Sequence, residues 1–323
     1  MSDGPGAAPP AVVIGEALTD VLVDSGGRRR GLPGGSPANV ALGLGRLGHP
    51  VRFATRIGRD TNGDQLRRRL RDGGVLLAPG SVTERPTSTA TALLDGSGSA
   101  AYDFDIAWAP SRQAVETVRT GPPAHLHTGS IATALPPGAD AVFDAVGRAQ
   151  ESATTSYDPN LRPALLGPPG RERARVEQLV EVSDVVKASA EDLDWLYPGQ
   201  GAERAAQRWA TAGPAMVVLT LGDRGARAWW RHGSYRVPPV PVRVADTVGA
   251  GDAFMSCLVS SLLRAGLLGG SPACREALAA ATDAALLPPP IVAALSLASR
   301  AAALTCGREG ADPPTRKELT SLF

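Results

Sequence analysis

The residues best suited to chemistry form one stretch, Asp246-Thr247-Val248-Gly249-Ala250-Gly251-Asp252. It ends in the carboxylate of Asp252 directly after a Gly-Ala-Gly turn, and an apolar helical run follows. Small residues let the backbone turn sharply and point successive N–H groups at one spot, and the next helix adds its positive end. A carboxylate beside such a turn suits phosphoryl transfer to a hydroxyl, because the turn can hold the phosphate while the carboxylate takes the alcohol proton.

A second group of small and polar residues lies near the N-terminus, in the motif Gly34-Gly35-Ser36-Pro37-Ala38-Asn39. The amide of Asn39 and the carboxylate of Asp20 provide the paired donors and acceptors that a polyol needs. Glycine at position 35 lets a ligand approach the backbone closely. Taken singly, these residues are equally typical of a loop before a helix and of the surface of an edge strand.

The elements that must position these residues alternate between strand-like and helical patterns. Short buried strands are predicted at residues 12–14, 51–54, 124–127, 154–157, 185–187 and 216–220, and helices at 40–47, 64–71, 176–182, 202–212, 253–268 and 291–304. This alternation predicts an α/β fold with a doubly wound, mostly parallel sheet flanked by helices. The turn cluster 95–99 between strand-like runs 88–94 and 100–106 predicts a β-hairpin, and the Pro-rich run 235–244 predicts edge strands.

Length and composition place the chain among globular proteins. It has 323 residues, 43% of them hydrophobic, and a net charge of +1, so nothing in its bulk charge indicates a nucleic-acid binder. No apolar run reaches membrane-spanning length without interruption, and residues 1–10 predict a flexible tail instead of a signal peptide. The three cysteines show no CxxC spacing, which favours reduced thiols and a cytoplasmic protein. His125 and His127 alternate on a strand without a third ligand nearby, so packing is expected for both.

The two signatures together resemble the ribokinase/PfkB family of carbohydrate kinases, and most of all its bacterial fructokinases. The resemblance runs from about Val12 to about Thr315, and the chain has no Walker-type GxxxxGK[ST] motif. Connecting pieces also match, among them Gly15-Glu16-Ala17-Leu18-Thr19-Asp20, Asp158-Pro159-Asn160-Leu161-Arg162 and Thr220-Leu221-Gly222-Asp223-Arg224-Gly225. The resemblance implies one kinase domain over residues 11–323, with a small β-sheet lid from about 17–33 and 87–108.

The resemblance also implies roles for individual residues. Asp252 would be the catalytic base, and Gly249, Ala250 and Gly251 the anion hole for the developing charge. The sugar would be held by Asp20, Gly35 and Asn39, with Phe104 from the lid. The nucleotide side would contain Thr220, Gly222, Gly225, Asn160, Lys187 and Ser189. Asp192 stands where the family often has a glutamate that orders Mg²⁺ through water, and Asp246 matches a position that binds a monovalent cation in many relatives, which makes K⁺ a candidate ion.

The expected activity is transfer of the γ-phosphoryl group of ATP to a primary hydroxyl of a sugar, with a neutral ketohexose such as fructose as the favoured acceptor. An acidic sugar, 2-keto-3-deoxygluconate, is the alternative, and Asp105 in the lid would repel it. A nucleoside kinase of the same fold would use Phe104 and Trp108 to stack a base, and an inactive sugar- or nucleotide-binding regulator is the non-enzyme alternative. The expected partners are sugar and ATP, without nucleic acid or membrane, and a homodimer could form through the lid.

Overall fold

The computed structural model describes residues 9–24, 26–94, 100–116 and 123–321. Residues 1–8 of the predicted tail and the predicted hairpin turn 95–99 lie outside these ranges.

The centre of the molecule is a nine-stranded sheet with strand order β15-β14-β13-β12-β11-β10-β1-β4-β6. Strand β1 pairs in parallel with β4 and β10, and the parallel pairing continues through β13, whereas β14 and β15 run antiparallel at one edge. The doubly wound, mostly parallel sheet predicted from the alternating pattern is therefore confirmed. The strands are β1 (Ala11–Ile14), β4 (Val51–Ala54), β6 (Val75–Leu77), β10 (His125–Gly129), β11 (Thr154–Asp158), β12 (Val185–Ser189), β13 (Met216–Thr220), β14 (Ala226–Trp230) and β15 (Gly233–Val237).

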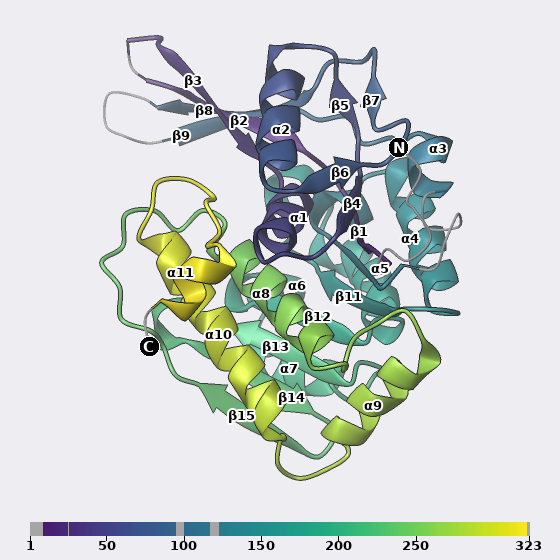
Figure 1. Cartoon of the computed structure of the whole chain (residues 1–323). Coiled ribbons are helices and arrows are strands. Elements are labelled where there is room, and N and C mark those ends of the chain that lie inside the picture. The colour runs from purple at the N-terminus through teal and green to yellow at the C-terminus, as the bar shows by residue number, and fades with distance from the viewer. Residues whose placement is uncertain (1–8, 25, 95–99, 117–122, 322–323) are drawn as a thin grey trace.

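Helices cover both faces of this sheet (Figure 1). One buried cluster contains residues of α1 (Ser36–Arg46), α2 (Thr61–Asp72), α8 (Ala250–Arg264), α9 (Pro272–Thr282), α10 (Pro289–Cys306) and α11 (Arg316–Thr320). The cluster on the opposite face contains residues of α3 (Arg112–Glu116), α4 (Gly138–Ala149), α5 (Pro169–Glu181), α6 (Ala190–Leu196) and α7 (Ala202–Trp209). Helix α10 is long and apolar enough to cross a membrane, but Ile291 and Leu295 are fully buried in the first cluster, as expected of a core helix.

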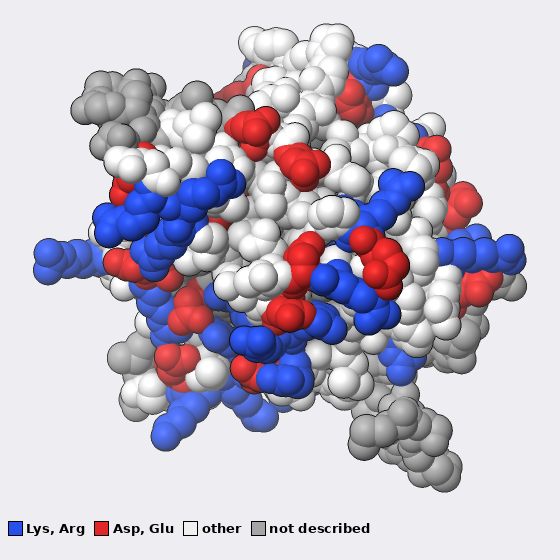
Figure 2. Space-filling view, turned by 90° about the horizontal axis from the view of Figure 1, so that it is seen from above, with Lys and Arg blue, Asp and Glu red and all other residues white. Residues whose placement is uncertain are grey.

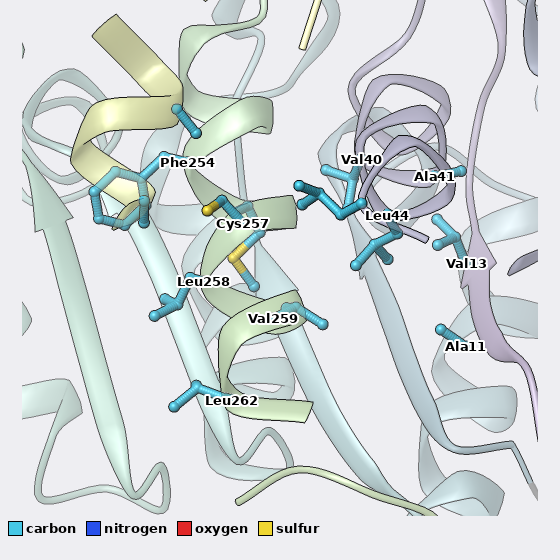
Figure 3. Close-up of a cluster of buried hydrophobic side chains, with 14 of the residues drawn as sticks. Ala11, Val13, Val40, Ala41, Leu44, Phe254, Cys257, Leu258, Val259 and Leu262 are labelled. Atoms are coloured by element: carbon cyan, nitrogen blue, oxygen red, sulfur yellow. The ribbon is translucent and has the colours of Figure 1, made fainter. Parts of the chain in front are cut away.

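Helices α1 and α8 lie against each other, and this contact sets the position of the two signature motifs. Val40 and Leu44 of α1 belong to the same buried cluster as Cys257 and Leu258 of α8 (Figure 3). A Cβ atom at Gly43 would lie 2.2 Å from Ser256 Oγ, so a glycine is needed for so close an approach. The two motifs, far apart in the sequence, thereby start neighbouring helices.

A separate small sheet projects from one end of the main sheet (Figure 1), with strand order β3-β2-β8-β9. Its strands are β2 (Leu18–Val23), β3 (Arg29–Gly34), β8 (Ser88–Leu94) and β9 (Ala100–Asp105), and β8 and β9 form the predicted antiparallel hairpin. A further pair of short strands, β5 (Ile57–Gly58) and β7 (Val82–Thr83), lies nearby. In the small sheet, Asp20 pairs with Ala90 and Ala90 with Phe104, so these side chains share one face.

Viewed from the end that carries α2 and the small sheet, acidic and basic side chains lie next to one another (Figure 2). Exposed pairs such as Arg59 with Glu84, at 2.7 Å, contribute to this mixture. This face thus has no large field of one sign, in keeping with the small net charge.

Two boundaries predicted from the sequence, the start of one helix and the end of one strand, were wrong. Helix α8 begins at Ala250, not at residue 253, so Asp252 lies within its first turn. The predicted strand 235–244 ends at Val237, because Pro238, Pro239 and Pro241 have no N–H to donate to a neighbouring strand.

Candidate active site

Several polar residues, most of them singled out in the sequence, follow the carboxyl ends of parallel strands. Glu16 and Asp20 come after β1, Asp158 ends β11, Ser189 ends β12 and Thr220 ends β13. Since these strands are parallel, all of their carboxyl ends lie at one edge of the sheet, which is where ligands bind in folds of this kind.

Asp252 is held between the first turns of two helices. Ser36 Oγ donates a hydrogen bond of 2.7 Å to one carboxylate oxygen of Asp252, and Asn39 Nδ2 donates one of 2.9 Å to the other. Asp252 is only 7% exposed. The residue predicted as the base and the asparagine predicted to hold the sugar are therefore in direct contact, at the positive ends of α1 and α8. Sequence reasoning missed the part played by Ser36, although its hydroxyl lies within the signature motif.

The turn before Asp252, which the sequence predicts as the anion hole, depends on its glycines. Gly249 caps α8 in a left-handed conformation, with φ 76°, and a Cβ atom there would lie 2.5 Å from Ala311 Cβ. At Gly251, a Cβ atom would lie 3.0 Å from Lys187 Nζ. The ammonium group of Lys187 thus stands directly against the turn.

Lys187 is a buried cation with a buried partner. Its Nζ lies 2.9 Å from Asp158 Oδ2, and the two side chains are 4% and 1% exposed. Burial is the largest single influence on the pKa of Lys187 and would lower it, but the carboxylates of Asp158, Asp192 and Asp252 together outweigh burial and raise that pKa. Lys187 therefore carries its charge beside the turn at neutral pH.

Asp20 faces the same region from the small sheet. A Cβ atom at Gly34 would lie 2.1 Å from Asp20 Oδ2, so the carboxylate occupies the space that a side chain at position 34 would need. Burial, together with the charge of Asp252, raises the pKa of Asp20 to about 6, and the nearby charge of Arg162 opposes this shift. The charge of Asp252 thus reaches Asp20.

The reason proposed for Gly35 from the sequence was wrong. A Cβ atom at this residue would lie 2.7 Å from the carbonyl oxygen of Glu16, so the chain's own backbone fills the space that the sequence argument left for a ligand. Its φ of 100° also requires glycine. A sugar contact by Gly35 would have to come from its backbone.

Glu16 is a buried carboxyl that the sequence did not single out as a site residue. Burial raises its pKa to about 7, although the N–H of Ala132 donates to it at 3.1 Å and Arg162 lies within electrostatic reach. Glu16 and Asp20 therefore both lie within electrostatic reach of Arg162.

Ser189 and Asp192 form a capping box at the start of α6. The Ser189 hydroxyl accepts from Asp192 N, and one Asp192 oxygen accepts from Ser189 N and Oγ. The other Asp192 oxygen accepts from Leu161 N at 2.7 Å, which ties the loop containing Asn160 to α6. Asn160 has a φ of 36° and its Oδ1 accepts from Arg162 at 2.7 Å. Both oxygens of Asp192 therefore already accept hydrogen bonds within the protein. A cation near Asp192 would be held through water instead of by direct contact with the carboxylate.

Three of the six residues expected at the nucleotide, Thr220, Gly222 and Gly225, differ in their surroundings. Thr220 ends β13, and its hydroxyl lies 3.4 Å from the carbonyl oxygen of Ala188. Gly222 has no atom within 4 Å of the place where a Cβ would be, so space is open there. At Gly225 a Cβ would lie 2.3 Å from the Val237 carbonyl, so this glycine is needed for contact with β15.

Asp246 links two backbone segments. One of its oxygens accepts from Val248 N at 3.0 Å and the other from Gly310 N at 2.9 Å. In the described part of the chain, no three His, Cys, Asp or Glu side chains gather as ligands for a metal ion. A cation at this carboxylate would thus need backbone carbonyls or water.

Three further residues bear on the predictions made from the sequence. The histidines pack as expected, since His125 and His127 are buried and both contact Ser156 Oγ, at 2.8 and 2.9 Å. Asp105 pairs with Thr89 and so lies on the opposite face of the small sheet from Asp20 and Phe104. The prediction that Asp105 repels an acidic sugar therefore has no structural basis.

A doubly wound sheet with a carboxylate and an amide turn at its carboxyl edge, and a small sheet beside them, defines a ribokinase-like phosphotransferase. The chain belongs to the pfkB family of carbohydrate kinases, whose profile matches residues 11–318. It is accordingly a kinase that acts on a sugar hydroxyl.

Individual relatives agree with this assignment. The chain is 34% identical over 261 residues to a fructokinase of Rhizobium leguminosarum bv. trifolii, covering 79% of this chain and 80% of that one. It is similar to the crystal structure of a fructokinase with bound ATP from Xylella fastidiosa, with TM-score 0.80, 27% identity and 97% of each chain covered. A Vibrio cholerae O395 fructokinase double mutant, solved with fructose, ADP and potassium ion, gives TM-score 0.74 at 27% identity, covering 94% of each chain.

Proposed function

We propose that this protein is an ATP-dependent fructokinase that phosphorylates a primary hydroxyl of the sugar. The observation that carries the proposal is the contact of Asp252 with Ser36 and Asn39, because it joins the base to the sugar-binding motif. The fructokinase names of several relatives, and the fructose and ADP bound in one solved relative, support the choice of sugar.

In this mechanism Asp252 accepts the proton of the sugar hydroxyl while that oxygen bonds to the γ-phosphorus and ADP leaves. Ser36 and Asn39 orient the carboxylate through their hydrogen bonds to it. Asn39 also gives part of its hydrogen bonding to the sugar when the sugar is bound. The amides of residues 249–251 and the charge of Lys187 stabilise the negative charge on the transferred group.

The residues present fit a nucleotide. Open space beside Gly222 adjoins the carboxyl end of β13, and Lys187 supplies the buried cation that a P-loop lysine provides in other kinases. Mg²⁺ bound to ATP would neutralise phosphate charge, and Asp192 would orient it through water. K⁺ at Asp246 stays a prediction.

The sugar would lie between Asp20 and Asn39, below the small sheet that carries Phe104. Asp20 and Glu16 both lie within electrostatic reach of Arg162, so their charge, when they are ionised, partly balances the charge of that arginine. This balance favours a neutral sugar over 2-keto-3-deoxygluconate. Closure of the small sheet over the sugar stays a prediction, and so does the cytoplasmic location. A dimer formed through this sheet is also a prediction, and the sheet exposes Leu22 and Leu93.

An ATP-coupled assay with fructose, 2-keto-3-deoxygluconate and adenosine as competing acceptors tests the proposal. We expect kcat/KM for fructose to exceed the other two by about tenfold or more, the size of discrimination that one well-placed polar contact gives. A higher kcat/KM for the keto acid or for adenosine would replace fructose as the substrate. Tight sugar binding without turnover of any acceptor would support the inactive regulator.

A further inference from the structure

The loop that follows α10 forms the back of the turn that starts α8. Ala311 in this loop contacts Gly249, where a Cβ atom would lie 2.5 Å from Ala311 Cβ. On the same side, Gly310 N donates to Asp246 Oδ2 at 2.9 Å, and the N–H groups of Ala245 and Asp246 donate to the carbonyl of Cys306. The backbone of residues 245–249 therefore rests on residues 306–311.

Arginines of helices α1 and α2 hold this loop, together with Arg308 of the loop itself. Arg46, in the last turn of α1, donates to Asp312 Oδ1 and to the carbonyl of Pro313, both at 2.6 Å. Arg308 contacts the other oxygen of Asp312 at 3.3 Å. Arg69, in the last turn of α2, donates from Nη2 to the carbonyl oxygen of Ala311.

Arg69 differs from the other two because its acceptor belongs to the residue that touches Gly249. Helix α2, which carries it, is also fixed at its other end, where Asp60 accepts from Thr87 N at 2.7 Å and from Thr87 Oγ1 at 2.8 Å. Thr87 immediately precedes β8 of the small sheet. Arg69 therefore connects Ala311, which lies behind the turn of residues 249–251, to a helix anchored at the base of that sheet.

We propose that Arg69 is a positioning residue for phosphoryl transfer, and that it holds the amides of residues 249–251 in place through Ala311. The inference depends on the proposed role of that turn. A displacement of Ala311 would free Gly249 to leave its left-handed conformation and would turn the amides away from the transferred group. Because Arg69 touches neither sugar nor nucleotide in this account, its loss should lower kcat and leave the KM for sugar unchanged.

The test compares wild type with R69M, which keeps the apolar stem and removes the donors, and with R69K, which retains a charged donor. R68M on the exposed neighbouring position of α2 is the matched control. We expect kcat of R69M to fall about ten- to a hundredfold. This is the effect expected when one amide of residues 249–251 no longer donates a hydrogen bond to the charged group in the transition state. R69K should be intermediate, and R68M should match wild type.

Hydrogen exchange supplies a readout other than activity. The amides of residues 245–251 should exchange faster in R69M than in R68M, while those in the middle of α8 should not change. A wild-type kcat together with wild-type exchange in R69M would overturn the inference. An equal rise in exchange throughout α8 and α10 would also overturn it, because the role would then be general stability. If R69M does not fold, the same exchange comparison on R69K decides, and wild-type exchange of 245–251 counts against the inference. Wild-type protein that phosphorylates no sugar would instead refute the proposed function.

Discussion

At the scale of single residues, the site contains buried ionisable side chains. Their burial costs free energy of folding, but their positions suit the proposed sugar binding and phosphoryl transfer. Asp20 lies against Gly34 near Asp252, and burial raises its pKa to about 6. An acid whose pKa is raised in the folded state opposes folding wherever it is ionised. Asp20 is therefore explained better by sugar binding than by stability.

This cost gives a prediction for Asp20→Asn. The variant should be more stable than wild type above pH 6, by up to about 3 kcal/mol for a shift of about two pKa units, and the difference should vanish below about pH 4, where Asp20 is protonated in both states. Its KM for sugar should rise, whereas that of wild type should rise only as the pH falls through 6. Urea unfolding across pH measures the first effect, and Asp103→Asn, an exposed change on the same sheet, is the control. A variant less stable than wild type at pH 7.5 would show that Asp20 is a structural residue.

At the scale of elements, the site depends on the start of α8. Gly249 needs a left-handed conformation and also lies against Ala311, so it is constrained twice. Gly266, two residues beyond the end of the same helix, has a similar φ of 69° with no atom within 4 Å of a Cβ position.

The two glycines form a matched pair for substitution by alanine. Gly266→Ala should cost about 1 kcal/mol of unfolding free energy, from backbone strain alone. Gly249→Ala should cost about 1–3 kcal/mol more, because Ala311 must move, and it should lose most of its turnover. Thermal or urea unfolding of both proteins measures the difference. Equal losses of unfolding free energy in the two variants would show that the contact with Ala311 does not contribute to stability.

Much of this site could be predicted from the sequence, but not all of it for the right reason. Asp252, the turn 249–251 and Asn39 could be found because small residues beside a polar side chain carry a local signal. The hydrogen bond from Ser36 and the contact of Ala311 with Gly249 could not, because both depend on how elements far apart in the sequence pack. Gly35 was assigned to the site by its motif, but the space that a side chain there would need is filled by the backbone of Glu16.

At the scale of the whole molecule, the fold brings the two signatures together over one sheet edge. The parallel sheet was predictable from the alternation of apolar runs, and the hairpin of the small sheet from its turn cluster. The pairing of β2 with β8 was not, since it joins strands from separate segments. The same topology places Asp105 and Asp20 on opposite faces, which no local pattern could reveal.

Asp252→Asn tests whether Asp252 takes the proton of the sugar hydroxyl. Asparagine keeps the shape of the side chain and can still accept from Ser36, but it cannot serve as a base. We predict that the variant keeps its melting temperature within a few degrees, binds ADP as wild type does, and loses turnover by about 10²–10⁴-fold, the usual contribution of a general base. A folded Asp252→Asn protein with kcat close to that of wild type would contradict the account.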